Sequence, residues 1–391
     1  MKRILLPLLL FCTAVFAFSI DFGVLVDQQF EMNNTTADYN PILIPWFSWN
    51  TDNGVSLYLS GLLSLQYNKF KDGSGSSLDL FPEFSRFSLS YRHAGFYAAA
   101  GRIAYTDAMG MIASGLFDGS KIEANIPVGT ISAAALYTGF LYKKTAEINM
   151  TADDIAANSM PWNISDFGSY YASKRLLTSL RLDLPLAEYN TITFEALTQI
   201  DLNNREDSLN SQYTAVMAEL YPQGKSGFIF GLLFEAMENR KGEFNAAFGA
   251  MFRYKTDVPG FLNDGFNVTM KFTSGSWGKT FTAFTPVTSH SQAKFLPLSI
   301  SGLGMFSTDY TVLFHRTLKA EASFSYYMRT YKDPELKGVF YGGEVWGSIV
   351  WQPFSELRLL FEGGAFFPNM GNIFSGTDTL WKARAGLVLS F

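Results

Sequence analysis

The sequence predicts an all-β protein, a transmembrane antiparallel up-and-down β-barrel of about 18 strands. Three observations predict this fold class. Segments of alternating polarity recur roughly every 20 residues. The connections between these segments alternate between short and long, and the last segment continues to the final residue, Phe391.

The recurring segments each have one apolar parity, while the other parity carries Ser, Thr, Gln, Glu, Lys or Arg. A period of two is the pattern of a strand with one apolar and one polar face. The longest uncharged run, residues 124–142, contains Pro127 and Gly129 in a strand–turn–strand pattern, which argues against a membrane helix. The clearest segments are GVSLYLSGLLSLQY (54–67), NTITFEALTQIDL (190–202), FNVTMKFT (266–273), AEASFSYYMRTY (320–331) and ELRLLFEGGAFF (356–367).

The connections divide into short turns and long polar loops. Outer-membrane barrels show this alternation, with tight periplasmic turns and longer outer loops. In the segment PILIPWFSWN (41–50), Pro41 and Pro45 cannot donate to a ladder, which leaves about 16 strands as an alternative. The short connections are 51–53, 93–95, 127–129, 186–189, 223–226 and 353–355, and the long ones are 69–78, 106–117, 144–166, 203–210, 274–302 and 368–378.

The final strand alternates up to its last residue. Its apolar face carries Trp381, Ala383, Ala385, Leu387, Leu389 and Phe391, and its other face carries Lys382, Arg384, Gly386, Val388 and Ser390. At about 3.3 Å per residue, Trp381 and Phe391 are separated by roughly 33 Å. A strand tilt of about 40° reduces this to roughly 25 Å, the height of the apolar band of a membrane barrel. We therefore expect the two aromatic rings at opposite membrane interfaces.

The N-terminus, MKRILLPLLLFCTAVFAFS, has the layout of a secretory signal peptide. Two basic residues precede an apolar run that is too short to span a bilayer, and small residues follow it. We predict a signal peptide over residues 1–19, with cleavage after Ala17 or Ser19, and a single barrel domain over 20–391. The only cysteine, Cys12, lies in the leader, so disulfides and thiolate metal sites are not expected in the mature chain.

Charge and motifs argue against several classes of function. Removal of Lys2 and Arg3 leaves 28 basic against 35 acidic residues, a net charge of −7 that disfavours nucleic acid as a partner. No metal-ligand spacing, phosphate loop or dinucleotide motif is present, so we expect neither a cofactor nor a metal. Of the three histidines, only His290 lies in a long outer loop, and its serine neighbours are commonplace, so we expect no enzyme.

The final strand resembles that of bacterial outer-membrane β-barrel proteins, which end on alternating apolar residues and a C-terminal aromatic. The resemblance implies a location in the cell outer membrane, contact with its lipid, and recognition of Trp381, Leu387, Leu389 and Phe391 by the barrel-assembly machinery. A count near 18 strands without a plug domain looks like the porin-type channels. Gly101-Arg102 and Asp118-Gly119 resemble segments of the sugar- and alginate-export-type porins. Such barrels are often homotrimers, but the sequence identifies no interface.

The inner face of such a barrel should be polar. At about 16–18 strands the interior is too wide for side chains to fill, which leaves an aqueous channel. Basic residues on the lipid face would cost about 2–4 kcal/mol at mid-membrane. Glu321 and Glu344 are expected to point inward as well. The predicted channel-lining residues are Arg86, Arg92, Arg102, Lys121, Arg175, Arg181, Glu195, Asp201, Glu219, Glu235, Lys271, Arg329, Arg358, Glu362, Lys382 and Arg384.

The inward charges are unevenly distributed. Strands containing Glu195 to Glu235 supply only acids, whereas strands around 86–102 and the last two supply mostly Arg and Lys. Facing arcs of opposite sign would set up a transverse field that orients polar solutes. The alternative is that opposite charges pair across strands in a solvated lumen.

The longest connection, residues 274–302, is not hydrophilic. Phe281, Phe284 and Phe295 need cover, and a long loop without its own secondary structure is usually functional or disordered. Folding into the lumen would bury these rings and narrow the pore. The alternative is an outer lid packed on neighbouring loops.

These observations predict a porin that admits small hydrophilic solutes by passive diffusion. Size and charge would filter the solutes, without energy input. The alternative is a surface adhesin or a structural barrel, in which the long loops 144–166 and 274–302 bind partners.

Overall fold

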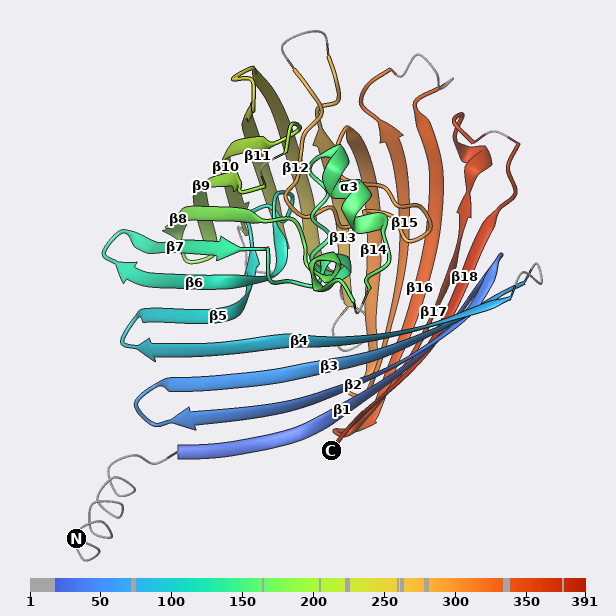
Figure 1. Cartoon of the computed structure of the whole chain (residues 1–391), viewed down its shortest axis with the longest axis horizontal. Coiled ribbons are helices and arrows are strands. Elements are labelled where there is room, and N and C mark those ends of the chain that lie inside the picture. Colours follow the sequence, from blue (N-terminus) through green and yellow to red (C-terminus); the bar gives the residue numbers. More distant parts are fainter. Residues whose placement is uncertain are drawn as a thin grey trace, which may run out of the picture.

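The computed structural model describes residues 18–71, 75–163, 165–203, 205–221, 226–258, 260, 264–277, 281–332, 338–374 and 376–391. They form a closed antiparallel barrel of 18 strands (Figure 1). Residues 1–17 lie outside the described residues, so the signal peptide and its cleavage site stay predictions.

Strands and short helical segments follow one another in simple chain order. No helix among the described residues is long and apolar enough to cross a membrane. The helical segments are α2 (Lys143–Ala146), α3 (Ala152–Ser159), η1 (Phe167–Tyr170) and η2 (Pro368–Met370). The strands are β1 (Phe18–Asn33), β2 (Thr36–Thr51), β3 (Val55–Phe70), β4 (Ser76–His93), β5 (Phe96–Thr106), β6 (Ser114–Ile126), β7 (Gly129–Tyr137), β8 (Arg175–Ala187), β9 (Asn190–Asp201), β10 (Leu209–Leu220), β11 (Ser226–Asn239), β12 (Phe244–Val258), β13 (Asp264–Thr273), β14 (Leu303–His315), β15 (Leu318–Arg329), β16 (Phe340–Phe354), β17 (Leu357–Phe367) and β18 (Leu380–Ser390).

The barrel closes where β1 pairs with β18, from Leu25 opposite Ser390 to Asn33 opposite Lys382. The last residue completes this seam, because the Phe391 N–H donates to the Val24 carbonyl at 3.0 Å and the Val24 N–H donates back at 3.1 Å. Every other strand pairs with its neighbours in the sequence. The predicted closed up-and-down barrel of 18 strands is therefore confirmed.

The uncertain segment 41–50 is part of β2. Its pairing with β1 is continuous, whereas its pairing with β3 is interrupted beside Pro41 and again beside Pro45. Since proline has no N–H to donate, these gaps lie where the β2–β3 ladder loses a bond. The sheet tolerates both prolines, and the alternative of about 16 strands is wrong.

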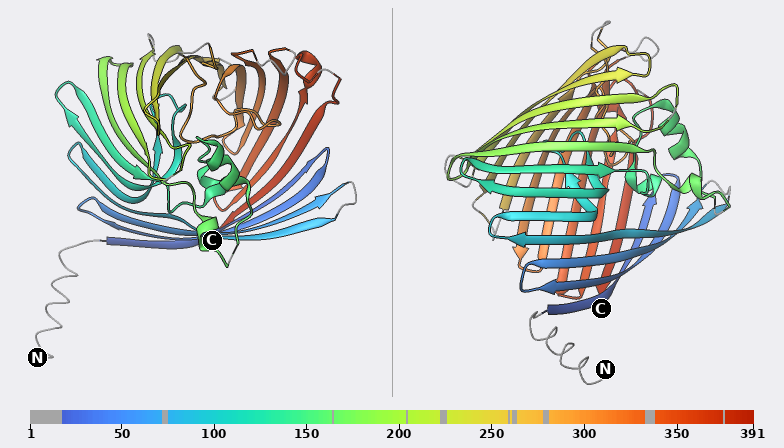
Figure 2. Two further views of the ribbon diagram at one scale, coloured as in Figure 1. Left: turned by 45° about the horizontal axis from the view of Figure 1, so that its top comes forward. Right: turned by 60° about the vertical axis from the view of Figure 1, so that its left-hand side comes forward.

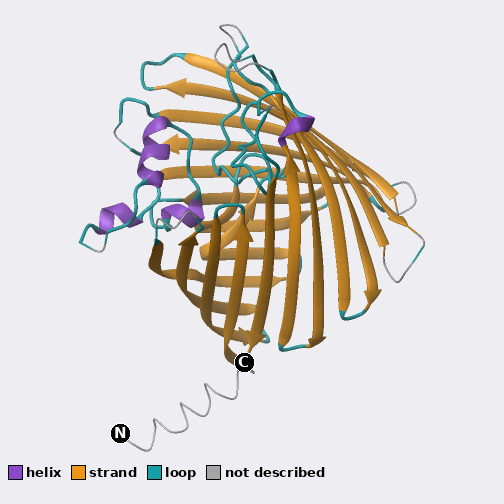
Figure 3. Ribbon diagram, turned by 90° about the vertical axis from the view of Figure 1, so that its right-hand side faces the viewer, coloured by secondary structure: helices purple, strands orange, loops and turns teal. Residues whose placement is uncertain are grey.

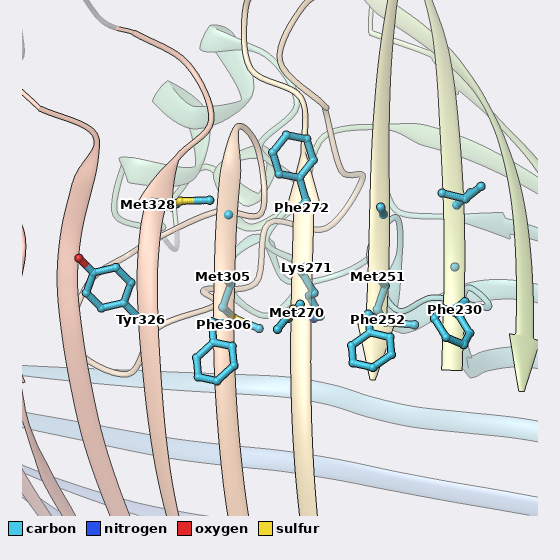
Figure 4. A pocket seen from close by; sticks show the side chains of 14 residues that line it. Phe230, Met251, Phe252, Met270, Lys271, Phe272, Met305, Phe306, Tyr326 and Met328 are labelled. Atoms are coloured by element: carbon cyan, nitrogen blue, oxygen red, sulfur yellow. The ribbon is translucent and has the colours of Figure 1, made fainter. Parts of the chain in front are cut away.

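The two faces of the strands differ as the alternation predicts. On β11, Phe228, Phe230, Leu232 and Phe234 are exposed on the outside. The alternate residues of the same strand, including Glu235, are buried on the inside. Outward apolar side chains of β11–β15 line a shallow groove of about 580 Å³ (Figure 4). An apolar outer belt of this kind is what contact with lipid requires.

Candidate functional site: the barrel lumen

Three connecting segments, namely 107–113, 138–174 and 274–302, pack against the barrel at one end. In Figure 2 the loops that follow β5 and β13 lie inside the ring of strands, whereas the helices of 138–174 lie beside the strand ends at the side of the barrel. Their apolar side chains form one buried cluster with inward side chains of the wall. Among the described residues, this cluster contains none from β1–β4, β17 or β18. Members from the loops include Met111, Ile112, Leu141, Ile148, Phe284 and Val287, and members from the wall include Leu177, Leu197, Tyr213, Met217, Leu233 and Met251.

The first segment, 107–113, is a tight turn organised by a carboxylate. Asp107 accepts hydrogen bonds from the backbone N–H groups of Met109, Met111, Ile112 and Ala113, between 2.8 and 3.2 Å. Four backbone donors on one buried carboxylate make the turn rigid, because each donor would otherwise be left unpaired.

Glu195 on β9 ties this turn to the wall. Its carboxylate accepts from the Ala108 N–H at 2.6 Å, the Tyr105 hydroxyl at 2.7 Å and the Ser179 hydroxyl at 3.0 Å. The side chain is buried beneath the turn. Glu195 therefore supports a loop, and it contributes little surface to an open channel.

Residues 284–300 of the longest connection lie in the lumen, whereas Trp277 and Phe281 at its start pack on the outward rings of Phe248 and Phe272. Phe284 and Val287 are fully buried. The Thr285 N–H donates to Glu235 at 2.9 Å, and the Tyr213 hydroxyl donates to the Thr285 carbonyl at 2.6 Å. Both wall residues belong to the inner face, so the loop is packed against it.

Three more contacts hold the far half of this loop. Lys271 on β13 donates to the Gln292 side chain at 3.0 Å, and the Tyr327 hydroxyl donates to the Gln292 carbonyl at 3.0 Å. The Lys294 N–H donates to Glu344 at 3.1 Å. The loop thus bridges β10 to β16 across the lumen, and it narrows the passage.

Arg175 and Asp201 hold the segment 138–174. The fully buried Arg175 guanidinium contacts Asp154 of α3 at 2.5 Å and Asp201 at 2.8 Å. Asp154 also pairs with Arg205 at 3.1 Å. A capping box between Thr151 and Asp154 starts α3 at this point. Arg175 and Asp201 are therefore buried in a network that positions a loop.

The prediction that Arg102 lines the channel is wrong. Arg102 lies opposite Phe87 and Asp118 on the outward parity of β5. The side chain is buried, pairs with Asp118 at 2.9 Å, and donates to the carbonyls of Phe84 and Phe140. An arginine is tolerated on this face because every part of its fork is satisfied inside the wall.

Opposite charges are paired at several of the other predicted lining positions. The Lys121–Glu123, Arg181–Asp183 and Lys382–Glu31 pairs are 2.5, 2.9 and 3.1 Å long, and Arg384 pairs with Glu362. Arg329 is buried and donates to the Gly338 carbonyl, whereas Glu219 is half-buried. This arrangement favours local pairing over uncompensated arcs of charge.

Three of the predicted channel-lining arginines, Arg86, Arg92 and Arg358, make no ion pair among the described residues. Arg86 lies 5.3 Å from the Tyr58 ring centre, and Arg92 lies 4.8 Å from that of Tyr97. Arg358 on β17 is exposed and makes no contact with an acid among the described residues. These guanidinium groups keep their charge available to a solute.

A contact that the sequence did not predict joins the segments 138–174 and 274–302 to the start of β6. His290 lies 2.6 Å from Glu147 through Nδ1 and 2.7 Å from the Ser114 carbonyl through Nε2. Both partners are acceptors, so the contact is complete only when both ring nitrogens carry protons. The hydrogen bond to Glu147 accordingly raises the pKa of His290 above its usual value.

We expect this contact to weaken at alkaline pH. A raised folded-state pKa means that the stabilisation is complete below the unfolded pKa of about 6.5. It is lost as pH rises through the higher folded value, when the imidazole can no longer donate to both acceptors. Single-channel recordings should then show more current noise above that pKa, and His290→Gln should be noisy at every pH. A matched His315→Gln variant, changed at the exposed end of β14, should keep the wild-type pH profile.

The fold and the lumen together define a wide closed barrel that is narrowed by its own loops. No family model matches the chain, and no curated protein matches it. Among solved structures, Pseudomonas aeruginosa OccK5 (OpdH) is similar over 95% of this chain and 98% of that chain, with a TM-score of 0.61 and 11% identity. The P. aeruginosa outer membrane protein OpdK matches 95% and 99% of the two chains, with a TM-score of 0.61 and 8% identity.

A further structure, P. aeruginosa OpdK with vanillate, has a TM-score of 0.62 at 10% identity and covers 95% of this chain and 98% of that chain. At such low identity the likeness concerns the fold, which these proteins share with the present chain along nearly its whole length.

Proposed function

We propose that this chain is an outer-membrane porin through which small hydrophilic solutes diffuse passively. The observation that carries the proposal is the half-filled lumen: the buried cluster of loops and wall residues extends over β5–β15, while β1–β4, β17 and β18 add nothing to it among the described residues. The passage lies along that second side. OpdK, which has the same fold, is an outer membrane protein and has been solved with vanillate, which supports both the location and the kind of cargo.

Filtering in this proposal has two physical sources. The loop 274–302 sets the width of the passage. The cations Arg86, Arg92 and Arg358 act on solute charge, and the paired groups Lys382 and Arg384 line the same side. Charges are screened over about 8 Å at physiological salt, so these groups select only where the passage is narrow. Passage of the solute involves no chemical step.

The adhesin or structural-barrel alternative loses one of its two binding loops, because residues 284–300 of the loop 274–302 are packed inside the lumen. Assembly partners are part of the porin proposal. The barrel-assembly machinery would recognise the closing strand, and a homotrimer is the arrangement that the resemblance suggests.

The discriminating experiment is conductance across a planar bilayer. The refolded protein should give discrete, salt-dependent conductance steps without an energy source. A preparation with heat-modifiable, barrel-like gel mobility that never conducts would overturn the porin proposal and favour a structural or adhesive role.

Selectivity gives a second test. Replacing Arg86 and Arg92 with Ser should move the reversal potential under a salt gradient toward cation preference. Two charges at about 8 Å in aqueous surroundings change a permeability ratio by about twofold, and more at low salt. The control is the double variant Arg384→Ser with Glu362→Ser, which removes a paired cation and anion together. An equal shift in both variants would show that Arg86 and Arg92 exert no specific effect.

A further inference from the structure

The barrel wall has a lateral notch between β4 and the strands that follow it. The ladder between β4 and β5 ends at Phe87 opposite Arg102. Residues 76–83 and Arg86 of β4 pair with β3, and residues 76–86 have no strand partner on the other side. In Figure 1, β4 extends well past the end of β5. A free strand edge within a membrane barrel needs another partner for its polar backbone.

The segment 138–174 supplies that partner together with Arg102 of β5. The Tyr170 hydroxyl donates to the Pro82 carbonyl at 3.0 Å, and the Arg102 guanidinium donates to the Phe84 carbonyl. The Tyr142 ring packs between Phe81 and Tyr170, with ring centres 5.6 and 4.6 Å apart. Figure 3 shows the helices of this segment at the side of the barrel, beside the strand ends. The segment therefore forms part of the wall.

The notch is level with the outer part of the apolar belt. On the outward face of β4, Leu78 lies opposite Tyr67 and Leu80 lies opposite Leu65. Leu78 and Leu80 are 63% and 51% exposed, which is what a lipid-facing surface shows. A group bound in the space beside Leu78 and Leu80 would therefore contact both the acyl chains and the headgroups of the outer leaflet.

A cleft of about 1280 Å³ lies in this notch. One wall is apolar and is made by Leu78, Leu80 and Pro82 of β4. The other wall contains Met160 and Trp162, which belong to the segment that fills the notch. A second, inner cavity shares Asp79, Pro161 and Trp162 with the cleft, so these residues separate the cleft from the lumen.

Three cations also line the cleft, namely Lys143, Lys174 and Arg205. Lys143 is 4% exposed, and its ammonium makes one side-chain hydrogen bond among the described residues, to the Ala157 carbonyl at 3.0 Å. An ammonium has three donors, so two remain available. Lys174 is exposed and makes no side-chain ion pair in the described part of the chain.

The acids of the cleft offset this charge only in part. Asp166 accepts from the Gly168 N–H at 3.0 Å and caps η1. Asp79 is the other lining carboxylate, and Arg205 is shared with Asp154. The cleft thus combines an apolar wall, interfacial aromatic rings and lysine donors with unused hydrogen-bonding capacity. This combination fits an anionic headgroup that carries acyl chains, because phosphate oxygens satisfy several donors at once.

We propose that the cleft binds the phosphorylated headgroup of an outer-leaflet glycolipid, with an acyl chain lying along Leu78 and Leu80. The bound lipid would complete the wall beside β4 and hold the segment 138–174 in place. This proposal rests on the outer-membrane location proposed above, but it does not depend on conduction.

The test is binding of bis-phosphorylated lipid A to the whole purified barrel in a neutral detergent, measured by native mass spectrometry. The wild type should retain lipid A, and dephosphorylated lipid A should bind about tenfold more weakly. Lys174→Ala, changed at an exposed side chain, should weaken binding by a similar factor, and the double variant with Lys143→Met should weaken it further. Lys241→Ala, in an exposed outer turn, is the matched control and should bind as the wild type does.

Three results would overturn the proposal. Equal binding of the phosphorylated and dephosphorylated lipids would show that no headgroup is recognised. If inorganic phosphate displaced lipid A equally well, the lysines would be a binding site for a soluble anion and not for a lipid headgroup. Unchanged binding by a correctly folded Lys174→Ala variant would place the lipid elsewhere. Conductance measured separately in a bilayer without lipid A tests the porin proposal independently.

Discussion

Deleting residues 276–299 should raise single-channel conductance by roughly two- to threefold and admit larger solutes, because an 18-strand barrel is an open channel unless something fills it. The loop fills it here: Phe284 and Val287 are fully buried inside the lumen, and Glu235 and Glu344 hold its backbone. Planar-bilayer recordings and liposome swelling with sugars of increasing size would measure both effects.

A second variant tests whether the loop must also be held in place by its hydrogen bonds to the wall. Glu235→Ala with Glu344→Ala keeps the loop but removes the acceptors of the Thr285 and Lys294 N–H groups. This variant should conduct with larger fluctuations than the wild type, between the wild-type and deletion levels. The control is a deletion in the turn 240–242, which joins β11 to β12 and has no member in the buried cluster, and it should leave conductance unchanged. Unchanged conductance in the 276–299 deletion would show that another segment sets the width.

The barrel itself could be predicted because its information is local. Alternation fixes which face of a strand meets lipid, as in β18, where Trp381 and Phe391 are exposed on one side and Arg384 pairs with Glu362 on the other. Turn composition then fixes where the chain reverses. Even the two prolines of β2 are compatible with a strand, because both missing N–H groups belong to the β2–β3 ladder and the β1–β2 ladder stays continuous.

The lumen was harder to predict because its contacts are non-local. Alternation decides only the face on which Glu195 and Glu235 lie, and it does not say that loops far along the chain cover them. Helix α3 is too short to show a helical period over three turns, so the boundaries 144–166 understated a segment that extends over 138–174. Arg102 was misplaced because charge was assumed to avoid the outer face, whereas Asp118 and two carbonyls satisfy it there.

Phe391→Asp should lower the amount of folded barrel in the outer membrane several-fold, while synthesis and export remain normal. In the folded barrel the Phe391 ring makes little contribution to packing. Its side chain is 76% exposed, and its contribution to closure comes from backbone hydrogen bonds with Val24, which any residue can make. A carboxylate near the membrane interface costs only about 0–1 kcal/mol, so packing and partitioning predict a small effect. A large effect therefore requires recognition of the aromatic ring before the barrel closes.

The matched control is Phe354→Asp. Phe354 is also a highly exposed aromatic residue, at the end of β16 beside the turn to β17, but it is not at the chain terminus. Heat-modifiable gel mobility of outer-membrane fractions measures the folded fraction for both variants. If Phe391 is an assembly signal, Phe354→Asp should assemble nearly as the wild type does, and Phe391→Tyr should restore assembly because it keeps the ring. Equal losses in the two Asp variants would assign the effect to the interfacial girdle, and normal assembly of Phe391→Asp would show that the closing strand is recognised without its last ring.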